Sequence, residues 1–86
     1  MRILIPSPLQ SYTAQQRQVE AEGSSLKEVL QTLDSEFPGI RFRMIDEHDR
    51  IRKHIRIFVN KQPVDNLDIS VKPTDEVQII CALSGG

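Results

Sequence analysis

At 86 residues, of which 38% are hydrophobic, the chain is long enough for one small domain with a modest core. Its 11 lysines and arginines nearly balance its 12 aspartates and glutamates, which argues against a general nucleic-acid binder. No apolar run approaches the roughly 20 residues that span a bilayer, and the single cysteine excludes a disulfide or a cysteine-rich metal site. The N-terminal stretch lacks the apolar region of a signal peptide. We therefore expect one cytoplasmic domain over residues 1–86, with no nucleic-acid or membrane partner and no bound cofactor or metal.

Two short strands are predicted at the beginning of the chain. Residues 2–6 are rich in β-branched side chains and end at a proline, which is typical of a strand. A polar, turn-rich stretch follows. Residues 17–23 then form a possible partner strand, in which only Val19 and Ala21 would point inward.

The clearest predicted element is an amphipathic helix over residues 25–37. Ser25 and Glu28 have the spacing of a capping box, in which each side chain accepts a hydrogen bond from the other's backbone amide. Pro38 and Gly39 would end the helix. Five apolar residues at helical spacing form the face to be buried: Leu26, Val29, Leu30, Leu33 and Phe37.

The second half of the chain predicts two further strands. Residues 40–44 alternate apolar side chains with arginines, which suits either an irregular strand or a short turn of helix. Residues 54–60 alternate as a strand should, and residues 60–63 resemble a turn. After a loop with a proline, residues 76–84 form the last strand, in which Val77, Ile79 and Cys81 share one face.

One helix and a mixed sheet make an α+β sandwich of two layers. The first and last strands are apolar and lack an interior proline, so both are expected at the centre of the sheet, paired in parallel. This arrangement is the β-grasp, or ubiquitin-like, fold.

Few residues are candidates for chemistry of their own. His48 and His54 lie among charged residues and are interpreted as solvated. A solvated turn is also the favoured interpretation of Asp46, Glu47 and Asp49, since a general acid–base pair needs a pocket to separate its pKa values. Six of the 11 basic residues lie between residues 41 and 56, and they form either a docking face for an acidic partner or an ordinary surface.

Three residues in the last two strands could serve packing or binding. Cys81 shares a face with Val77 and Ile79, so it is interpreted as a small apolar core residue rather than a reactive thiolate. Phe58 and Ile80 lie on the opposite faces of their strands from the inward residues. They form an exposed apolar patch that marks a partner surface, unless a loop covers them.

The sequence ends in Cys-Ala-Leu-Ser-Gly-Gly, residues 81–86. Glycine has no Cβ, so Gly85 and Gly86 would let the backbone enter a narrow channel. The tail after Leu83 can extend about 10 Å at roughly 3.3–3.6 Å per residue. An enzyme could then reach and activate the Gly86 carboxylate.

Specific motifs resemble the MoaD/ThiS family of ubiquitin-like sulfur carriers. They are "RIRKHIRIFVNKQPV" and "PTDEVQIICALSGG", including His54 to Asn60, Asp75 to Val77 and Ala82 to Gly86. The predicted helix lies where that family has its first helix. The resemblance implies a molybdopterin-synthase small subunit or a cysteine-biosynthesis type of carrier, which is a co-substrate of enzymes rather than an enzyme.

The resemblance also implies a mechanism and its partners. An E1-like enzyme would use ATP to adenylate Gly86, and a sulfur donor protein would convert the adenylate to a thiocarboxylate for a sulfur-accepting biosynthetic enzyme. Gly85 and Gly86 would enter the active site of the partner. The docking contacts are expected from Arg56, Phe58, Ile80, Leu83 and Ser84. Two alternatives remain: a protein modifier joined through Gly86 to lysines, and a plain β-grasp binding module.

Overall fold

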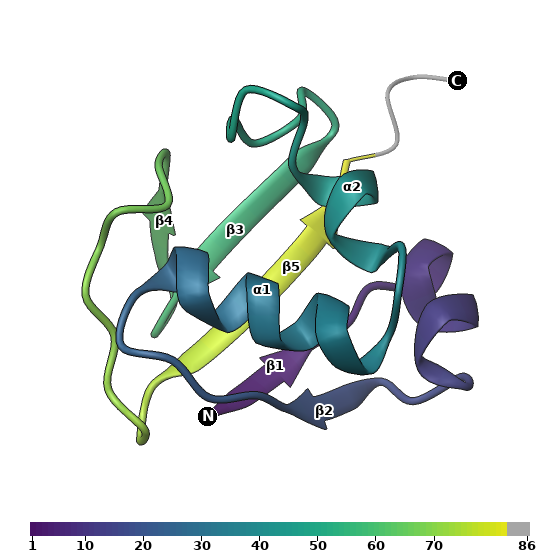
Figure 1. Cartoon of the computed structure of the whole chain (residues 1–86), viewed down its shortest axis with the longest axis horizontal. Coiled ribbons are helices and arrows are strands. Elements are labelled where there is room, and N and C mark those ends of the chain that lie inside the picture. The colour runs from purple at the N-terminus through teal and green to yellow at the C-terminus, as the bar shows by residue number, and fades with distance from the viewer. Residues whose placement is uncertain (83–86) are drawn as a thin grey trace.

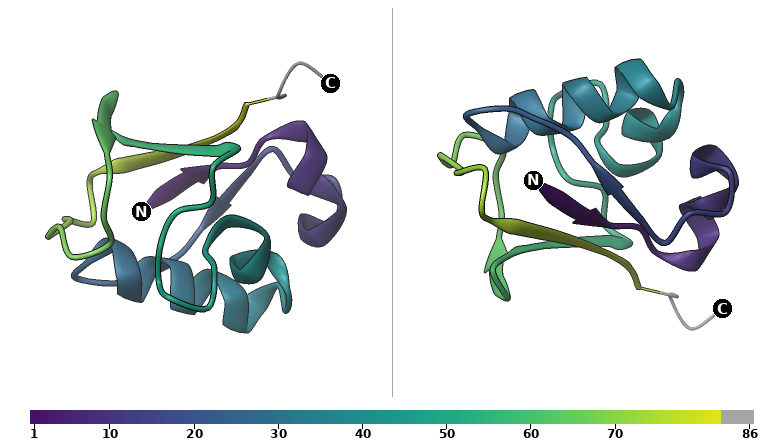
Figure 2. Two further views of the ribbon diagram at one scale, coloured as in Figure 1. Left: turned by 90° about the horizontal axis from the view of Figure 1, so that it is seen from above. Right: turned by 90° about the horizontal axis from the view of Figure 1, so that it is seen from below.

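Two layers make up the fold: a five-stranded mixed sheet, and α-helices that cover one of its faces (Figures 1 and 2). The computed structural model describes residues 1–82. The strands are β1 (Arg2–Leu4), β2 (Gln18–Glu20), β3 (Ile55–Val59), β4 (Gln62–Val64) and β5 (Glu76–Cys81). The helices are α1 (Leu26–Glu36), α2 (Ile40–Met44) and the 3₁₀ helix η1 (Ser7–Thr13).

The sheet has the strand order β2-β1-β5-β3-β4. β1 and β5 lie side by side and run parallel, with Ile3 opposite Val77. β3 runs antiparallel to β5, with Ile57 opposite Ile79. The prediction that the first and last strands lie inside the sheet as a parallel pair is therefore confirmed, and so is the β-grasp fold.

The edge strand β4 was not predicted from the sequence, which indicated only a turn at residues 60–63. Asn60 and Lys61 have positive φ values of 50° and 70° and form a two-residue hairpin turn. The chain then continues as a strand through Pro63, which lies opposite Phe58. A proline is tolerated there because β4 is at the edge of the sheet and needs no hydrogen-bond donor on its outer side.

The predicted helix is present as α1, but its N-terminal cap differs from the predicted capping box. The Ser25 Oγ accepts a hydrogen bond from the backbone N–H of Glu28 at 3.2 Å, as expected. The Glu28 carboxylate instead accepts from the N–H and the hydroxyl of Ser24, both at 3.0 Å. The reciprocal half of the cap thus lies one residue earlier than predicted.

A tight connection joins α1 to α2. Gly39 has a φ of 98°, a conformation that favours glycine, and a Cβ there would lie 3.2 Å from the ring of Tyr12. The Asp34 carboxylate accepts hydrogen bonds from the N–H groups of Gly39 and Arg41 at 3.1 and 3.0 Å. Residues 40–44 form a short helix, which is one of the two predicted alternatives. Ile40 and Met44 are four residues apart, so both lie on the same side of this helix, and both are buried.

The core lies between α1 and the inner face of the sheet. Alternate residues of the central strands point to this face, and each is at most 2% exposed: Ile3, Ile55, Ile57, Val77 and Ile79. α1 contributes Leu26, Val29, Leu30 and Leu33, all at 0%. Phe37 is partly buried and packs against the same cluster. The opposite face of the sheet, called the open face below, carries the intervening residues.

Candidate functional site

The open face places two of the predicted docking residues next to each other. Arg56 lies directly opposite Ile80, and Phe58 lies directly opposite Gln78. Phe58 and Ile80 are therefore diagonal neighbours on adjacent strands, a relation in which large side chains are within reach of each other. The alternation in two separate strands predicted their common face, and the register of β3 and β5 brings them together.

The two apolar side chains differ in exposure. Ile80 is 37% exposed, while Phe58 is half-buried. Phe58 is not among the partly buried hydrophobic residues that pack against the core. It lies instead on the open face between Pro63 of β4 and Gln78 of β5. The patch therefore consists of a half-buried aromatic side chain and a more exposed aliphatic one.

Arg56 borders this patch and is exposed. Its Nη1 donates hydrogen bonds to the backbone carbonyls of Lys53 and Ile55 at 2.9 and 3.1 Å. These bonds hold the guanidinium against the backbone where β3 begins, while the residue as a whole stays exposed. Arg56, Phe58 and Ile80 are thus adjacent, as a docking surface would require, and their role in binding stays a prediction.

The predicted tail begins at the end of β5. Cys81 lies opposite Ile55, and the N–H of Ala82 donates to the carbonyl of His54 at 2.7 Å. Ala82 is the last described residue and is exposed, at the border between the sheet and the segment that precedes β3. The predicted contact residues Leu83 and Ser84 and the predicted tail glycines Gly85 and Gly86 lie outside the described residues.

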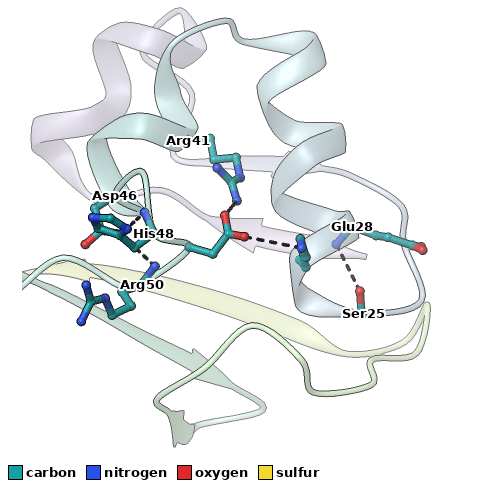
Figure 3. A network of polar contacts seen from close by, with 8 residues as sticks. Ser25, Glu28, Arg41, Asp46, His48 and Arg50 are labelled. Carbon is teal, nitrogen blue, oxygen red and sulfur yellow. Dashed lines mark hydrogen bonds and ion pairs between the residues drawn. The ribbon is translucent and has the colours of Figure 1, made fainter.

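The loop between α2 and β3 is fixed by its own polar contacts. The Asp46 carboxylate accepts from the N–H groups of His48 and Arg50 at 2.8 and 3.0 Å (Figure 3). Arg41 and Lys27 form ion pairs with Asp49 at 2.9 and 3.5 Å, which connects the loop to both helices. A β-bridge between Ile45 and Ile51 closes the loop at its base.

These contacts also set the ionisation of the loop. Backbone N–H donors, first that of Arg50, lower the pKa of Asp46. The hydrogen bond from Arg41 and the charge of Lys27 lower the pKa of Asp49. Both groups therefore stay ionised, and a general acid would need the opposite shift. The predicted interpretation of a solvated charged turn is confirmed, as both His48 and His54 are also exposed.

Cys81 is half-buried and packs against the core cluster. Burial raises the pKa of its thiol, so the thiol stays protonated at neutral pH. The position agrees with the predicted small apolar residue, although it lies at the margin of the core rather than inside it.

The described part of the chain contains no group of three or more His, Cys, Asp or Glu side chains that could hold a metal ion. Between residues 1 and 82, no helix is long and apolar enough to cross a membrane.

One surface residue was missed from the sequence. Phe42 was grouped with Ile40 and Met44, but it lies on the outer side of α2 and is 56% exposed. The Arg52 guanidinium lies 4.5 Å from the centroid of its ring, and Arg52 Nε donates to the Phe42 carbonyl at 2.7 Å. The sequence contained a signal for this exposure. Ile40 and Met44 are spaced as on one side of a helix, and that spacing places Phe42 on the other side.

Comparisons with known proteins agree with this geometry. The sequence matches the ThiS family over residues 3–86. The sulfur carrier protein CysO of Mycobacterium tuberculosis is 29% identical over 89 residues, which cover 98% of this chain and 96% of CysO. The CysO in a crystal structure of the Amycolatopsis orientalis BexX/CysO complex has a TM-score of 0.91 and 30% identity, with 99% of this chain and 98% of that chain covered.

A more distant structure shares the fold alone. Small archaeal modifier protein 1 from Methanosarcina acetivorans has a TM-score of 0.81 at 19% identity, with 99% of this chain and 94% of that chain covered. The family match spans nearly the whole chain and confirms both the predicted resemblance and the prediction of a carrier rather than an enzyme. The chain belongs to the ThiS family of ubiquitin-like sulfur carriers.

Proposed function

We propose that this carrier transports sulfur on Gly86. An E1-like enzyme would use ATP to convert the Gly86 carboxylate to an acyl-adenylate, with release of pyrophosphate. Sulfide-level sulfur from a donor protein would then displace AMP and leave a thiocarboxylate. A biosynthetic enzyme of the molybdopterin or cysteine type would accept the sulfur. ATP is a substrate of the activating enzyme and is not bound by the carrier.

The family match supports this proposal most strongly, because it extends to residue 86. The geometry is compatible with it. The central strand β5 leads directly to Ala82, and the surrounding sheet supplies a rigid body that a partner could hold. Positioning of a reacting group in this way supplies a large part of the rate enhancement in many enzymes. The carrier therefore needs no acid, base or metal of its own.

Docking is proposed at the open face around Phe58, Ile80 and Arg56. An exposed or half-exposed aromatic residue beside an arginine is typical of residues that dominate binding energy. The relative in the BexX/CysO complex is bound to a second protein, which supports a protein partner for this chain. Leu83, Ser84 and Gly85 are proposed to accompany Gly86 into the active site of that partner.

Removal of one residue tests the role of the tail. The chain and a variant that lacks Gly86 would each be incubated with an E1-like adenylating enzyme from the same genome, ATP, magnesium and a sulfide source. We expect AMP formation and a mass gain equal to the replacement of oxygen by sulfur in the full chain, and neither in the shortened one. Activity that survives the deletion would contradict every function that uses this tail.

The same experiment separates the carrier from the protein modifier. In cell extract with ATP, a carrier would yield the thiocarboxylate as its main product. A modifier would instead yield proteins with Gly86 in isopeptide linkage to lysine, detectable by peptide mass spectrometry. A chain that gives neither product with the activating enzyme would be a plain β-grasp binding module.

A further inference from the structure

The basic residues of the chain are concentrated at one end of the molecule. Six of the 11 lie between residues 41 and 56. Arg41 forms an ion pair with Asp49, whereas Arg43, Arg50, Arg52, Lys53 and Arg56 form no ion pair with any carboxylate in residues 1–82. The same stretch holds Asp46, Glu47 and Asp49, so residues 41–56 carry six cations and three carboxylates and have a net positive charge.

These cations surround an aromatic side chain and two shallow hollows. One hollow, of about 330 Å³, is lined by Phe42, Arg43, Arg52 and His54. The second, of about 420 Å³, is lined by Asp46, Arg50, Ile51, Arg52, Lys53 and His54. The surface formed by these residues is called the basic rim: Phe42, Arg43, Arg50, Arg52, Lys53 and His54.

The basic rim lies beside the point where the tail leaves the fold. His54 accepts the backbone hydrogen bond of Ala82, so the two segments are in direct contact. The α2–β3 loop and the end of β5 lie at the same end of the sheet (Figure 1). A tail that extends only about 10 Å obliges any enzyme that binds its end to approach this rim closely.

The opposite end of the molecule, where β5 begins, carries charges of both signs. Asp75 and Glu76 lie at this start of β5, and Glu76 forms an ion pair with Arg2 at 3.1 Å. Asp65 lies instead beside the basic residues, with which it lines a hollow that includes Arg50 and Lys53. The polar contacts that fix the α2–β3 loop keep its cations on the tail side. The cations of residues 43–56 that form no ion pair in residues 1–82 therefore lie at the end of β5, where an enzyme that binds the tail would meet them.

We propose that the basic rim docks on an acidic protein surface around the entrance to the tail channel of the E1-like enzyme. This inference rests on the proposed carrier function and adds its electrostatic recognition element. The rim would guide the encounter, while Phe42 would supply apolar contact at its centre. A nucleic acid fits less well, since the net charge is −1 and the carboxylates of Asp46, Glu47 and Asp49 beside the rim would repel a phosphate backbone.

The test is a matched pair of double variants. Arg43→Glu/Lys53→Glu reverses two cations of the rim, both exposed and without hydrogen bonds from their side chains in residues 1–82. Lys61→Glu/Lys72→Glu reverses two exposed cations away from the rim, in the β3–β4 turn and the loop before β5. Both doubles change the net charge equally. Circular dichroism would establish that both remain folded.

The measurement is the association rate with the E1-like enzyme from the same genome, by stopped-flow fluorescence at low and high salt. We expect the rim double to associate about tenfold or more slowly at low salt, the control double less than about twofold, and the difference to disappear at high salt. Equal rates for both doubles would overturn the proposal, as would rim-dependent binding of a DNA duplex in preference to the enzyme.

The wild-type chain distinguishes this proposal from the function on which it rests. If the wild-type carrier is adenylated and the two double variants associate at equal rates, only the proposal about the basic rim is wrong. If wild-type carrier is not adenylated at all, the proposed function is wrong and the rim proposal fails with it.

Discussion

Ile79 and Ile80 are neighbours in β5, yet their side chains lie on opposite faces of the sheet. Ile79 is 2% exposed and belongs to the core under α1, whereas Ile80 is 37% exposed on the open face beside Phe58. The same alternation applies to Ile57 and Phe58 in β3. A single pair of strands thus provides the stability of the domain on one face and a candidate docking surface on the other.

This division would let a partner of the proposed docking surface bind without disturbing the core. The inner face and α1 account for most of the buried apolar surface, which is the main stabilising contribution in a domain of this size. The open face contributes less, so its residues are available for recognition. Substitutions on the two faces should therefore affect different measurements.

The largest expected difference is between two alanine substitutions at adjacent positions. Ile79→Ala would leave a cavity in the core and should lower the free energy of unfolding by about 2–5 kcal/mol. Ile80→Ala removes a side chain that already contacts solvent and should cost less than about 1 kcal/mol. Urea denaturation of both variants measures the two values. Equal losses would mean that the open face is also part of the core.

The next effect concerns binding. Phe58→Asp would place a charge in the docking patch and should weaken affinity for the E1-like enzyme by about tenfold or more, with the fold retained. Phe58→Leu is the matched control, because it keeps an apolar side chain on the same strand and should bind nearly normally. Isothermal titration calorimetry measures affinity and circular dichroism the fold. A Phe58→Asp chain that fails to fold would identify Phe58 as a core residue.

The smallest effect is electrostatic and is confined to the surface. In the described chain the only buried polar or charged residue is Thr13, so acid should not act through the core. The pKa values of Asp46 and Asp49 are lowered in the folded state. Their contribution to stability is present above the ordinary aspartate pKa, about 3.9, and is lost as the pH falls through the lowered values.

We therefore expect the melting temperature to fall modestly as the pH decreases from about 5 to about 3. Asp49→Asn should lower the melting temperature slightly at neutral pH, because a carboxamide forms no ion pair with Arg41. The melting temperature of the variant should also depend less on pH, because the carboxamide is not protonated in this range. Thermal melts of both chains at each pH measure this. An unchanged pH dependence in the variant would show that the ion pair contributes nothing.

Much of this division could be predicted from the sequence, because it follows from local periodicity. The two-residue alternation in β3 and β5 indicated which residues face inward, and the spacing of leucines indicated α1. The parallel pairing of β1 with β5 followed from their apolar composition. In each case a repeated pattern over several residues carried the signal.

Features that depend on contacts between distant segments were missed or misplaced. β4 is only three residues long and contains Pro63, so its strand character comes from pairing with β3 rather than from its composition. The exposed position of Phe42 depends on how α2 packs against the core. The proximity of the basic rim to Ala82 depends on the register of β3 against β5. No short window of sequence contains that information.

The position of β5 between β1 and β3 has a mechanical consequence. Under the proposed function, an enzyme that held the tail would pull on Ala82, which directly follows β5. Hydrogen bonds to both neighbouring strands lie across that direction, so the load is shared along both borders at once instead of opening one pair at a time. A strand at the edge of the sheet would peel away far more easily. The central position of β5 would therefore help the domain to resist a pull on Ala82.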